Sequence, residues 1–255
     1  MAEKHIHFIY DSSKTVTQGF YTDLIHTYGQ TPAAEATHIV SVGGDGMLLE
    51  AFRKASQNQI VFGLTPPQGQ STGFWTNHSV ESAAQLNTAI DDASLYPIHP
   101  LRADMTYKDG SLKSLRAFNE FQPVRNTGQA FLTQLTIENE SCKIGPVRVM
   151  GDGIIVANAL GSTASNRSYG ASTFDIRNTG ISVAGIGICE PVGGVGPTIA
   201  AENTKLTLDF QSAGKRPMRL EYDGQMESSP DDNPVSQIKI QKETGFTVKL
   251  ALTED

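Results

Sequence analysis

The chain has 255 residues, and 27 Asp and Glu against 20 Lys and Arg give it a formal net charge of −7. At about 150 residues per domain, this length predicts one large or two small domains. The acidic balance argues against a nucleic-acid-binding protein dominated by phosphate contacts. It leaves room for a small phosphorylated ligand held by backbone N–H groups.

Two cysteines, Cys142 and Cys189, are too few for a disulfide framework and fit a reducing, cytoplasmic setting. The N-terminal segment MAEKHIHFIYD has only a short apolar run, and no apolar run in the chain reaches the roughly 18 residues of a membrane helix. We therefore expect neither a signal peptide nor a membrane partner, and a cytoplasmic location.

The first third of the chain alternates strand-like and helix-like segments. The apolar periodicity predicts strands at His5–Tyr10, Thr37–Val42 and Gln59–Leu64, and helices at Lys14–Tyr28, Met47–Ala55 and Ser79–Ile90. Such alternation predicts βαβ units, and hence an α/β domain with a parallel sheet.

From about Leu95 the pattern becomes rich in short β-type runs. These runs are Pro100–Tyr107, Leu112–Val124, Phe131–Glu138, Val147–Ala157, Lys205–Phe210, Met218–Tyr222, Val235–Gln241 and Phe246–Leu252. In this part only Gly161–Tyr169 begins like a helix, and the role of the glycine-rich segment Asn178–Pro197 stays open. We expect an α/β domain over residues 1–95 and a mostly β domain over 96–255, whose final strands can return to the first domain.

The first motif that carries chemistry is Gly43-Gly44-Asp45-Gly46, between a predicted strand and a predicted helix. Glycines let the backbone approach phosphate oxygens, and a helix N-terminus favours anions. Asp45 would repel a phosphate unless it serves as a base for a hydroxyl, or holds a cation directly or through water. The alternative is a tight turn with Asp45 as the N-cap of the helix.

Two further motifs are short polar pairs. Asn119 and Glu120 either end a strand or face a pocket, where Asn could pair with an adenine edge and Glu could accept from ribose hydroxyls. Asp223-Gly224 is by itself a hairpin signal.

The remaining motif couples a strand around Asp152 (Gly-Asp-Gly) to the run Gly-Ser-Thr-Ala-Ser at residues 161–165. Ser162 and Thr163 either cap the helix that starts there, or bind a pyrophosphate or a base with their hydroxyls and neighbouring N–H groups.

Taken together and in this order, the four motifs resemble those of the NAD kinase family, from about His38 to Gln225. That family has Gly-Gly-Asp-Gly-Thr in the first motif and Thr-Pro-x-Gly-Ser-Thr-Ala-Tyr after the Asp-Gly strand. Its fold is an α/β domain followed by a β-rich domain, with the active site between them. The resemblance implies an enzyme that transfers the γ-phosphoryl group of ATP, or of polyphosphate in some members, to the 2′-hydroxyl of the adenosine ribose of NAD.

The resemblance also implies roles for individual residues. Asp45 would be the catalytic base or orienting group at the acceptor hydroxyl, and Gly43, Gly44 and Gly46 would shape the phosphate loop. The implied dinucleotide-binding residues are Asn119 and Glu120 at the adenosine or ribose portion, Asp152 at the nicotinamide end (from the same or a neighbouring subunit), Ser162, Thr163, Ala164 and Ser165 around adenine and ribose, and Asp223 near the transferred group or the nicotinamide riboside.

The implied ligands are small-molecule nucleotides, ATP and NAD, with no nucleic acid. Mg²⁺ would be carried by the nucleotide phosphates and keep most of its waters, so we expect no metal ligands from the protein. Arg125 and Arg148 are candidate cations near the phosphates or, alternatively, surface residues. A homodimer or homotetramer is the usual state in the family.

Four departures from the family pattern leave alternatives open. Met47 stands for the usual Thr, Asn158-Ala159-Leu160 for Thr-Pro-x, and Ser165 for the usual Tyr. After Tyr169, where the family usually has Gly-Gly-Pro, this chain has Gly170-Ala171-Ser172-Thr173. The alternatives are a non-catalytic dinucleotide-binding regulator on the same fold, and a kinase of another hydroxyl substrate, since lipid kinases and phosphofructokinases share the Gly-Gly-Asp-Gly loop.

Overall fold

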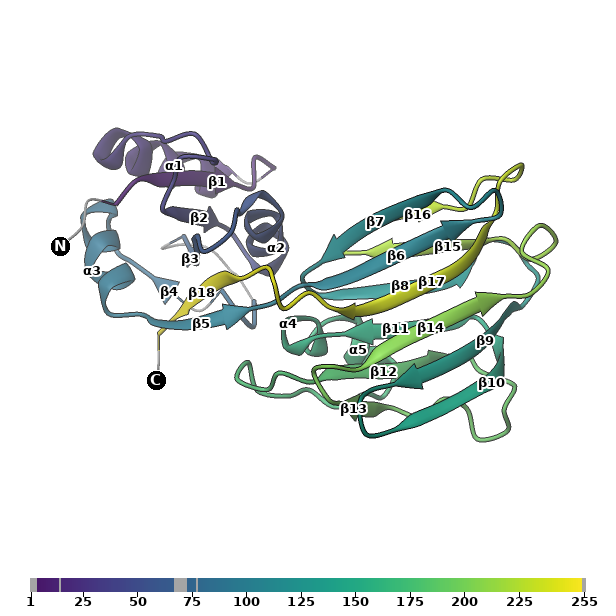
Figure 1. Ribbon diagram of the computed structural model, residues 1–255. Coiled ribbons are helices and arrows are strands. Elements are labelled where there is room, and N and C mark those ends of the chain that lie inside the picture. The colour runs from purple at the N-terminus through teal and green to yellow at the C-terminus, as the bar shows by residue number, and fades with distance from the viewer. Residues whose placement is uncertain (1–3, 14, 67–72, 77, 254–255) are drawn as a thin grey trace. The chain divides into compact units, whose positions relative to one another are not determined.

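The structure is a computed structural model that describes residues 4–13, 15–66, 73–76 and 78–253. The chain divides into two compact units, one made of Met1–His99 with Gly245–Asp255 and the other of Pro100–Thr244 (Figure 1). The division lies at residues 99 and 100, rather than at the expected 95 and 96, and the last strand belongs to the first unit. None of the helices in the described ranges is long and apolar enough to cross a membrane.

The first unit is built on a six-stranded sheet in the order β1-β2-β3-β18-β5, with β4 beside β3. Its strands are β1 (Ile6–Tyr10), β2 (His38–Val42), β3 (Ile60–Thr65), β4 (His78–Ser79), β5 (Ser94–Ile98) and β18 (Val248–Leu252). All neighbours are parallel except β5, which runs antiparallel to β18. The expected parallel sheet is therefore mixed, because β5 runs opposite to the other strands. The final strand returns and lies between β3 and β5.

Four helical segments accompany this sheet: α1 (Thr15–Tyr28), α2 (Asp45–Lys54), the 3₁₀ helix η1 (Ala83–Gln85) and α3 (Leu86–Asp91). Lys14, the first residue of the expected first helix, lies outside the described residues. The helix expected from Ser79 is wrong at its start. Ser82 and Gln85 form a reciprocal capping box, so helical structure begins only after Ser82.

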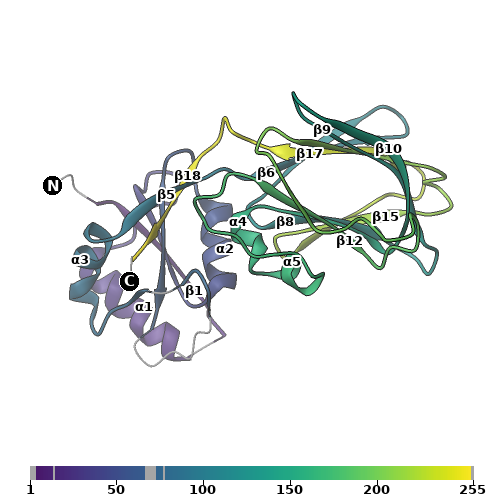
Figure 2. The same cartoon turned by 90° about the horizontal axis from the view of Figure 1, so that it is seen from below.

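The second unit contains two six-stranded antiparallel sheets, which Figure 2 shows as two layers. The strands of one sheet, in spatial order, are β10 (Lys143–Gly151), β9 (Phe131–Glu138), β14 (Lys205–Phe210), β17 (Val235–Lys242), β6 (Leu101–Tyr107) and β7 (Leu112–Ala117). Those of the other are β13 (Thr198–Ala200), β12 (Ile181–Ile186), β11 (Gly153–Ala157), β8 (Glu120–Arg125), β15 (Met218–Tyr222) and β16 (Gln225–Ser228). One apolar core, with Met105 from the first sheet and Phe121 from the second, is shared by both.

The face of the second sheet that points away from this core carries the short helices α4 (Ala159–Ser162) and α5 (Ser165–Ser168), which contact β11. The single helix expected over residues 161–169 is thus two short helices, the first of which starts earlier, at Ala159. The long strands expected at 112–124 and 147–157 are each broken in two, at residues 118–119 and at Asp152. Both breaks carry residues of the candidate site.

Candidate functional site

The glycine loop of the first unit joins β2 to α2. Gly43 has a φ of 154°, and a Cβ built on it would lie 3.1 Å from the Cβ of Met47. The carbonyl of Gly44 accepts hydrogen bonds from the N–H groups of Met47 at 2.9 Å and Leu48 at 3.1 Å. Gly44 is therefore the N-cap of α2, and the expected alternative of Asp45 in that position is wrong.

Asp45 is the first residue of α2, and its carboxylate binds the segment 74–76. Oδ1 accepts from Trp75 N at 3.0 Å, Thr76 N at 2.9 Å and the Thr76 hydroxyl at 3.1 Å. Oδ2 accepts from Phe74 N at 2.6 Å. An oxygen has two lone pairs, so Oδ1 is saturated by these donors. The carboxylate is thus held in place at the positive end of a helix dipole.

In the second unit, the turn between β15 and β16 is tied to the start of β8. Tyr222 pairs with Gln225, and the two residues between them have positive φ, 46° at Asp223 and 72° at Gly224. The expected hairpin is confirmed. The Asp223 side chain is buried, and it accepts from the N–H groups of Phe118 at 2.7 Å and Asn119 at 2.8 Å.

Glu120, the first residue of β8, is only 6% exposed. Its Oε1 lies 3.5 Å from the Gln122 amide nitrogen, and its Oε2 has no hydrogen-bond partner among the described residues. Burial, followed by the negative charge of Asp223, raises the pKa of Glu120 to about 7, while the contact with Gln122 opposes this rise. Glu120 therefore begins β8, with the half-buried Asn119 just before it, and Glu120 and Asp223 form a buried polar cluster.

The Gly-Ser-Thr turn lies against the same β7–β8 connection. Asn158 N donates to Asn119 O at 3.1 Å, and Asn158 Oδ1 accepts from Gly161 N at 3.3 Å. A Cβ on Gly161 would lie 2.2 Å from the carbonyl oxygen of Asn119, so a side chain has no room there. Asn158 is the N-cap of α4, and the expected capping by Ser162 or Thr163 is wrong.

The hydroxyls of this turn are engaged locally. Ser162 is fully buried, and its Oγ donates to Ala159 O at 2.7 Å and accepts from Phe174 N at 3.3 Å. Thr163 Oγ1 donates to Leu160 O at 3.1 Å. Ala164 is exposed, and as the N-cap of α5 it precedes the half-buried Ser165.

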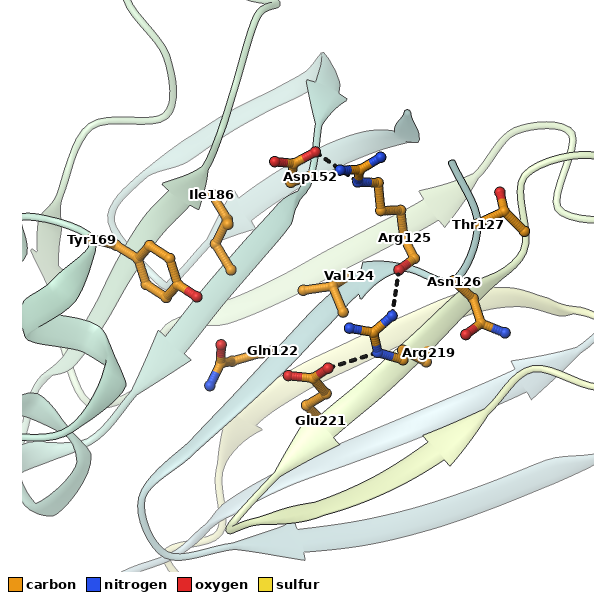
Figure 3. A pocket seen from close by; sticks show the side chains of 10 residues that line it. All are labelled: Gln122, Val124, Arg125, Asn126, Thr127, Asp152, Tyr169, Ile186, Arg219 and Glu221. Carbon is orange, nitrogen blue, oxygen red and sulfur yellow. Dashed lines mark hydrogen bonds and ion pairs between the residues drawn. The ribbon is translucent and has the colours of Figure 1, made fainter. Parts of the chain in front are cut away.

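Asp152 lines a pocket of about 430 Å³ on the face of the second sheet that points away from the core (Figure 3). The pocket is lined by Gln122, Val124, Arg125, Asn126, Thr127, Asp152, Tyr169, Ile186, Arg219 and Glu221. The Arg125 Nε lies 2.7 Å from Asp152 Oδ1, and the Arg219 Nε lies 2.6 Å from Glu221 Oε1. Its charged side chains are therefore paired with each other (Figure 3).

Most of this lining was not expected from the sequence. The available signal was the alternation in β15, where Met218 and Leu220 enter the core while Arg219 and Glu221 point to the opposite face. The other arginine considered in the sequence, Arg148, pairs with Glu190 at 2.6 Å.

Known proteins resemble this chain over most of its length. No protein-family model matches the chain. Over 242 residues, covering 94% of this chain and 89% of that protein, it is 24% identical to the NAD kinase of Hyphomonas neptunium. The fold is similar to that of yeast NADH kinase complexed with NADH, with a TM-score of 0.78 and 15% identity over 98% of this chain and 84% of that chain. These matches support membership of the NAD kinase family. An NAD kinase from Archaeoglobus fulgidus in complex with ATP is also similar, with a TM-score of 0.71 and 19% identity over 98% of this chain and 94% of that chain.

As a divergent NAD kinase family member, the chain distributes its candidate residues over both units. Asp45 and the glycine loop lie in the first unit. In the second, hydrogen bonds link Asn119 to Asp223 and to Asn158 at the start of the Gly-Ser-Thr turn, and the negative charge of Asp223 acts on Glu120. Asp152 lies in the neighbouring pocket, which Gln122 connects to Glu120.

Proposed function

We propose that this chain is an NAD kinase, which transfers the γ-phosphoryl group of ATP to the 2′-hydroxyl of the adenosine ribose of NAD and so gives NADP. The observation that carries the proposal is the match to the Hyphomonas neptunium NAD kinase. This match extends over 242 residues and therefore includes parts of both units. The retained acidic and amide residues of all four motifs support it.

Phosphoryl transfer requires positioning and neutralisation of charge more than covalent chemistry. In this proposal, the backbone of the glycine loop and the N-terminus of the ten-residue helix α2 face the phosphates. Asp45 orients the acceptor hydroxyl and accepts its proton. Its hydrogen bonds to residues 74–76 keep the carboxylate in one orientation, as a positioned base requires.

The cluster around Asp223 would bind the dinucleotide. Asn119, Glu120 and Asp223 offer groups for ribose hydroxyls, and Asp152 offers a carboxylate to the nicotinamide end. Because the Ser162 hydroxyl is used within the turn, Ser162 would shape the adenosine pocket. Thr163, Ala164 and Ser165 would contact the ligand directly.

Magnesium enters this proposal as part of the Mg²⁺–ATP substrate. Among the described residues, no three His, Cys, Asp or Glu side chains gather into a group that could hold a metal ion. In this proposal, phosphate oxygens and water supply the ligands of the ion, which suits the preference of Mg²⁺. ATP is the proposed donor, with another nucleotide or polyphosphate as the alternatives to test.

The proposal also includes a homodimer or homotetramer and a cytoplasmic location. The family's usual assembly supports the first point. Cys142 and Cys189, both exposed and both free thiols, support a reducing compartment.

The test is formation of NADP from NAD, ATP and Mg²⁺ by the unmodified protein, Asp45→Asn and the control Asp23→Asn. Asn loses the bond that Oδ2 accepts from the exposed Phe74, but it can retain Oδ1 and its three hydrogen bonds. The variant should therefore stay folded and bind NAD while turnover falls by orders of magnitude. Asp23 is an exposed residue of α1, and its change should leave turnover unaffected. Full activity in Asp45→Asn would remove Asp45 from the reaction. NAD binding without NADP formation by the unmodified protein, from ATP or from polyphosphate, would overturn the kinase proposal.

A further inference from the structure

Among the described buried acids, Glu120 is the one whose carboxyl group receives the fewest hydrogen bonds. A buried carboxylate is ordinarily stabilised by a cation or by several N–H donors. Glu120 has one long contact, 3.5 Å from the Gln122 amide, and its Oε2 has no partner among the described residues. At 6% exposure, solvent cannot replace these missing donors.

The nearby N–H donors go to Asp223 instead. Both Phe118 N and Asn119 N donate to Asp223, at 2.7 and 2.8 Å, and these bonds stabilise its negative charge. The β11 residue opposite Glu120 is Ala157, which has neither charge nor a polar side chain. On its own strand, Glu120 faces the neutral amide of Gln122. Asp223 is thus the ionised group that acts on Glu120, and its charge opposes a second one.

Two neighbouring buried carboxyl groups with different donors take different protonation states. Asp223, which accepts two backbone N–H bonds, is the ionised member of the pair. Glu120, which lacks such bonds, keeps its proton. Burial and the charge of Asp223 accordingly raise the pKa of Glu120 to about 7.

We propose that Glu120 binds the acceptor dinucleotide as a neutral carboxylic acid, whose Oε2–H donates a hydrogen bond to a ribose hydroxyl oxygen while Oε1 accepts one. A hydroxyl is both a donor and an acceptor, and so is a protonated carboxyl group, so the two are complementary. An ionised Glu120 could only accept, and it would add a second negative charge near a ligand that carries a pyrophosphate. The inference rests on the proposed function, since it takes an NAD-type ligand as the occupant.

Dinucleotide binding is then coupled to one proton. Above about pH 7 the free protein has lost the Glu120 proton and must take it up again to bind, so the dissociation constant of NAD should rise about tenfold for each further pH unit. Below this pH the affinity should be nearly constant.

The experiment is titration calorimetry of NAD binding to the full chain at about pH 6 and about pH 8.5, in buffers with different ionisation enthalpies. The variants are Glu120→Gln, which is neutral at every pH and still donates through its amide, and Glu140→Gln, which makes the same change at an exposed position between β9 and β10. The unmodified protein and Glu140→Gln should take up close to one proton at about pH 8.5 and bind more weakly there. Glu120→Gln should take up none at that site and bind with similar affinity at both pH values.

Proton uptake that is absent in the unmodified protein, or that persists in Glu120→Gln, would overturn the inference. Folding of the variant is checked by its thermal unfolding midpoint. This midpoint should exceed that of the unmodified protein by a margin that grows as the pH rises from about 4.5 to about 7, because the unfolded chain ionises Glu120 at lower pH than the folded one does. A protein that forms NADP with pH-independent NAD binding would refute this inference alone. A protein that binds NAD with proton uptake but forms no NADP would refute the proposed function alone, and one that does not bind NAD would refute both.

Discussion

The carboxylate of Asp223 accepts a hydrogen bond from the backbone N–H of Asn119 at 2.8 Å, although 104 positions separate the two residues. With the bond from Phe118 N, this contact fixes the start of β8, the strand that carries Glu120. A two-residue hairpin turn therefore positions the polar cluster. The stability of this cluster and the proposed ligand site both depend on the carboxylate of Asp223.

Asp223→Asn should lower the free energy of unfolding by about 1–3 kcal/mol, because an amide nitrogen replaces one acceptor and leaves a buried N–H unpaired. Asn tolerates the positive φ at this position as well as Asp does, so the backbone conformation itself is not strained. Urea unfolding measures the effect. Asp109→Asn is the control, since Asp109 also precedes a turn glycine but is exposed. Equal losses in both variants would contradict the role of Asp223.

Gly46→Ala should change stability and activity in opposite directions, raising the first and lowering the second. Gly46 lies in α2, and a Cβ there would meet no atom within 4 Å. Alanine should therefore raise the free energy of unfolding by about 0.5–1 kcal/mol through the lower entropy of its unfolded chain. If phosphate oxygens approach the backbone at this glycine, kcat/KM should fall at the same time.

The matched control for Gly46 is Gly19→Ala in α1, another helical glycine with nothing within 4 Å. It should raise stability and leave turnover unchanged. Kinetics that are unaltered in Gly46→Ala would show that the phosphates do not approach this part of the loop.

His78 should make the first unit sensitive to acid. The ring is 3% exposed, and it stacks on Phe62 with 4.0 Å between centroids. Its Nε2 donates to Ala251 O at 3.0 Å. Burial lowers the pKa of His78 below 6.5, and the bond to Ala251 only partly offsets this shift.

Since the unfolded chain binds the proton at higher pH than the folded one, stability is complete above about pH 6.5 and falls as the pH decreases below it. Urea unfolding at about pH 8 and about pH 5.5 measures this loss. His78→Gln should be less stable at both values but less dependent on pH, whereas the exposed His26→Gln should keep the dependence of the unmodified protein. An unchanged slope in His78→Gln would assign the acid sensitivity to other groups.

Ser165→Tyr should tighten NAD binding about tenfold, because an aromatic ring stacked on a ligand contributes about 1–1.5 kcal/mol. Ser165 opens α5 and is half-buried beside the Gly-Ser-Thr turn, where the family has its tyrosine. Calorimetry with NAD checks the prediction, with Ser141→Tyr in an exposed turn as the control. Weaker binding would mean that this part of the pocket differs from that of the family. Tyr169, which lines the neighbouring pocket, would then be the ring to test next.

Much of the architecture follows from local pattern. Phe131–Glu138, Lys205–Phe210 and Met218–Tyr222 are strands with the predicted bounds, because alternating apolar residues specify a two-sided strand without help from distant parts of the chain. The Asp223-Gly224 hairpin is equally local, since both residues adopt positive φ readily. The order of the four motifs was likewise enough to predict the family.

Contacts between distant residues determined the rest. The antiparallel direction of β5 made the first sheet mixed, and β18 lies between β5 and β3. No local pattern specifies which strand a returning segment joins. The position of Asn158 beside Asn119 and the break at residues 118–119 depend on hydrogen bonds to partners far along the chain. The state of Glu120 was also beyond local prediction, because a carboxyl group's pKa depends on burial and on neighbouring charges, and only folding places Asp223 beside it.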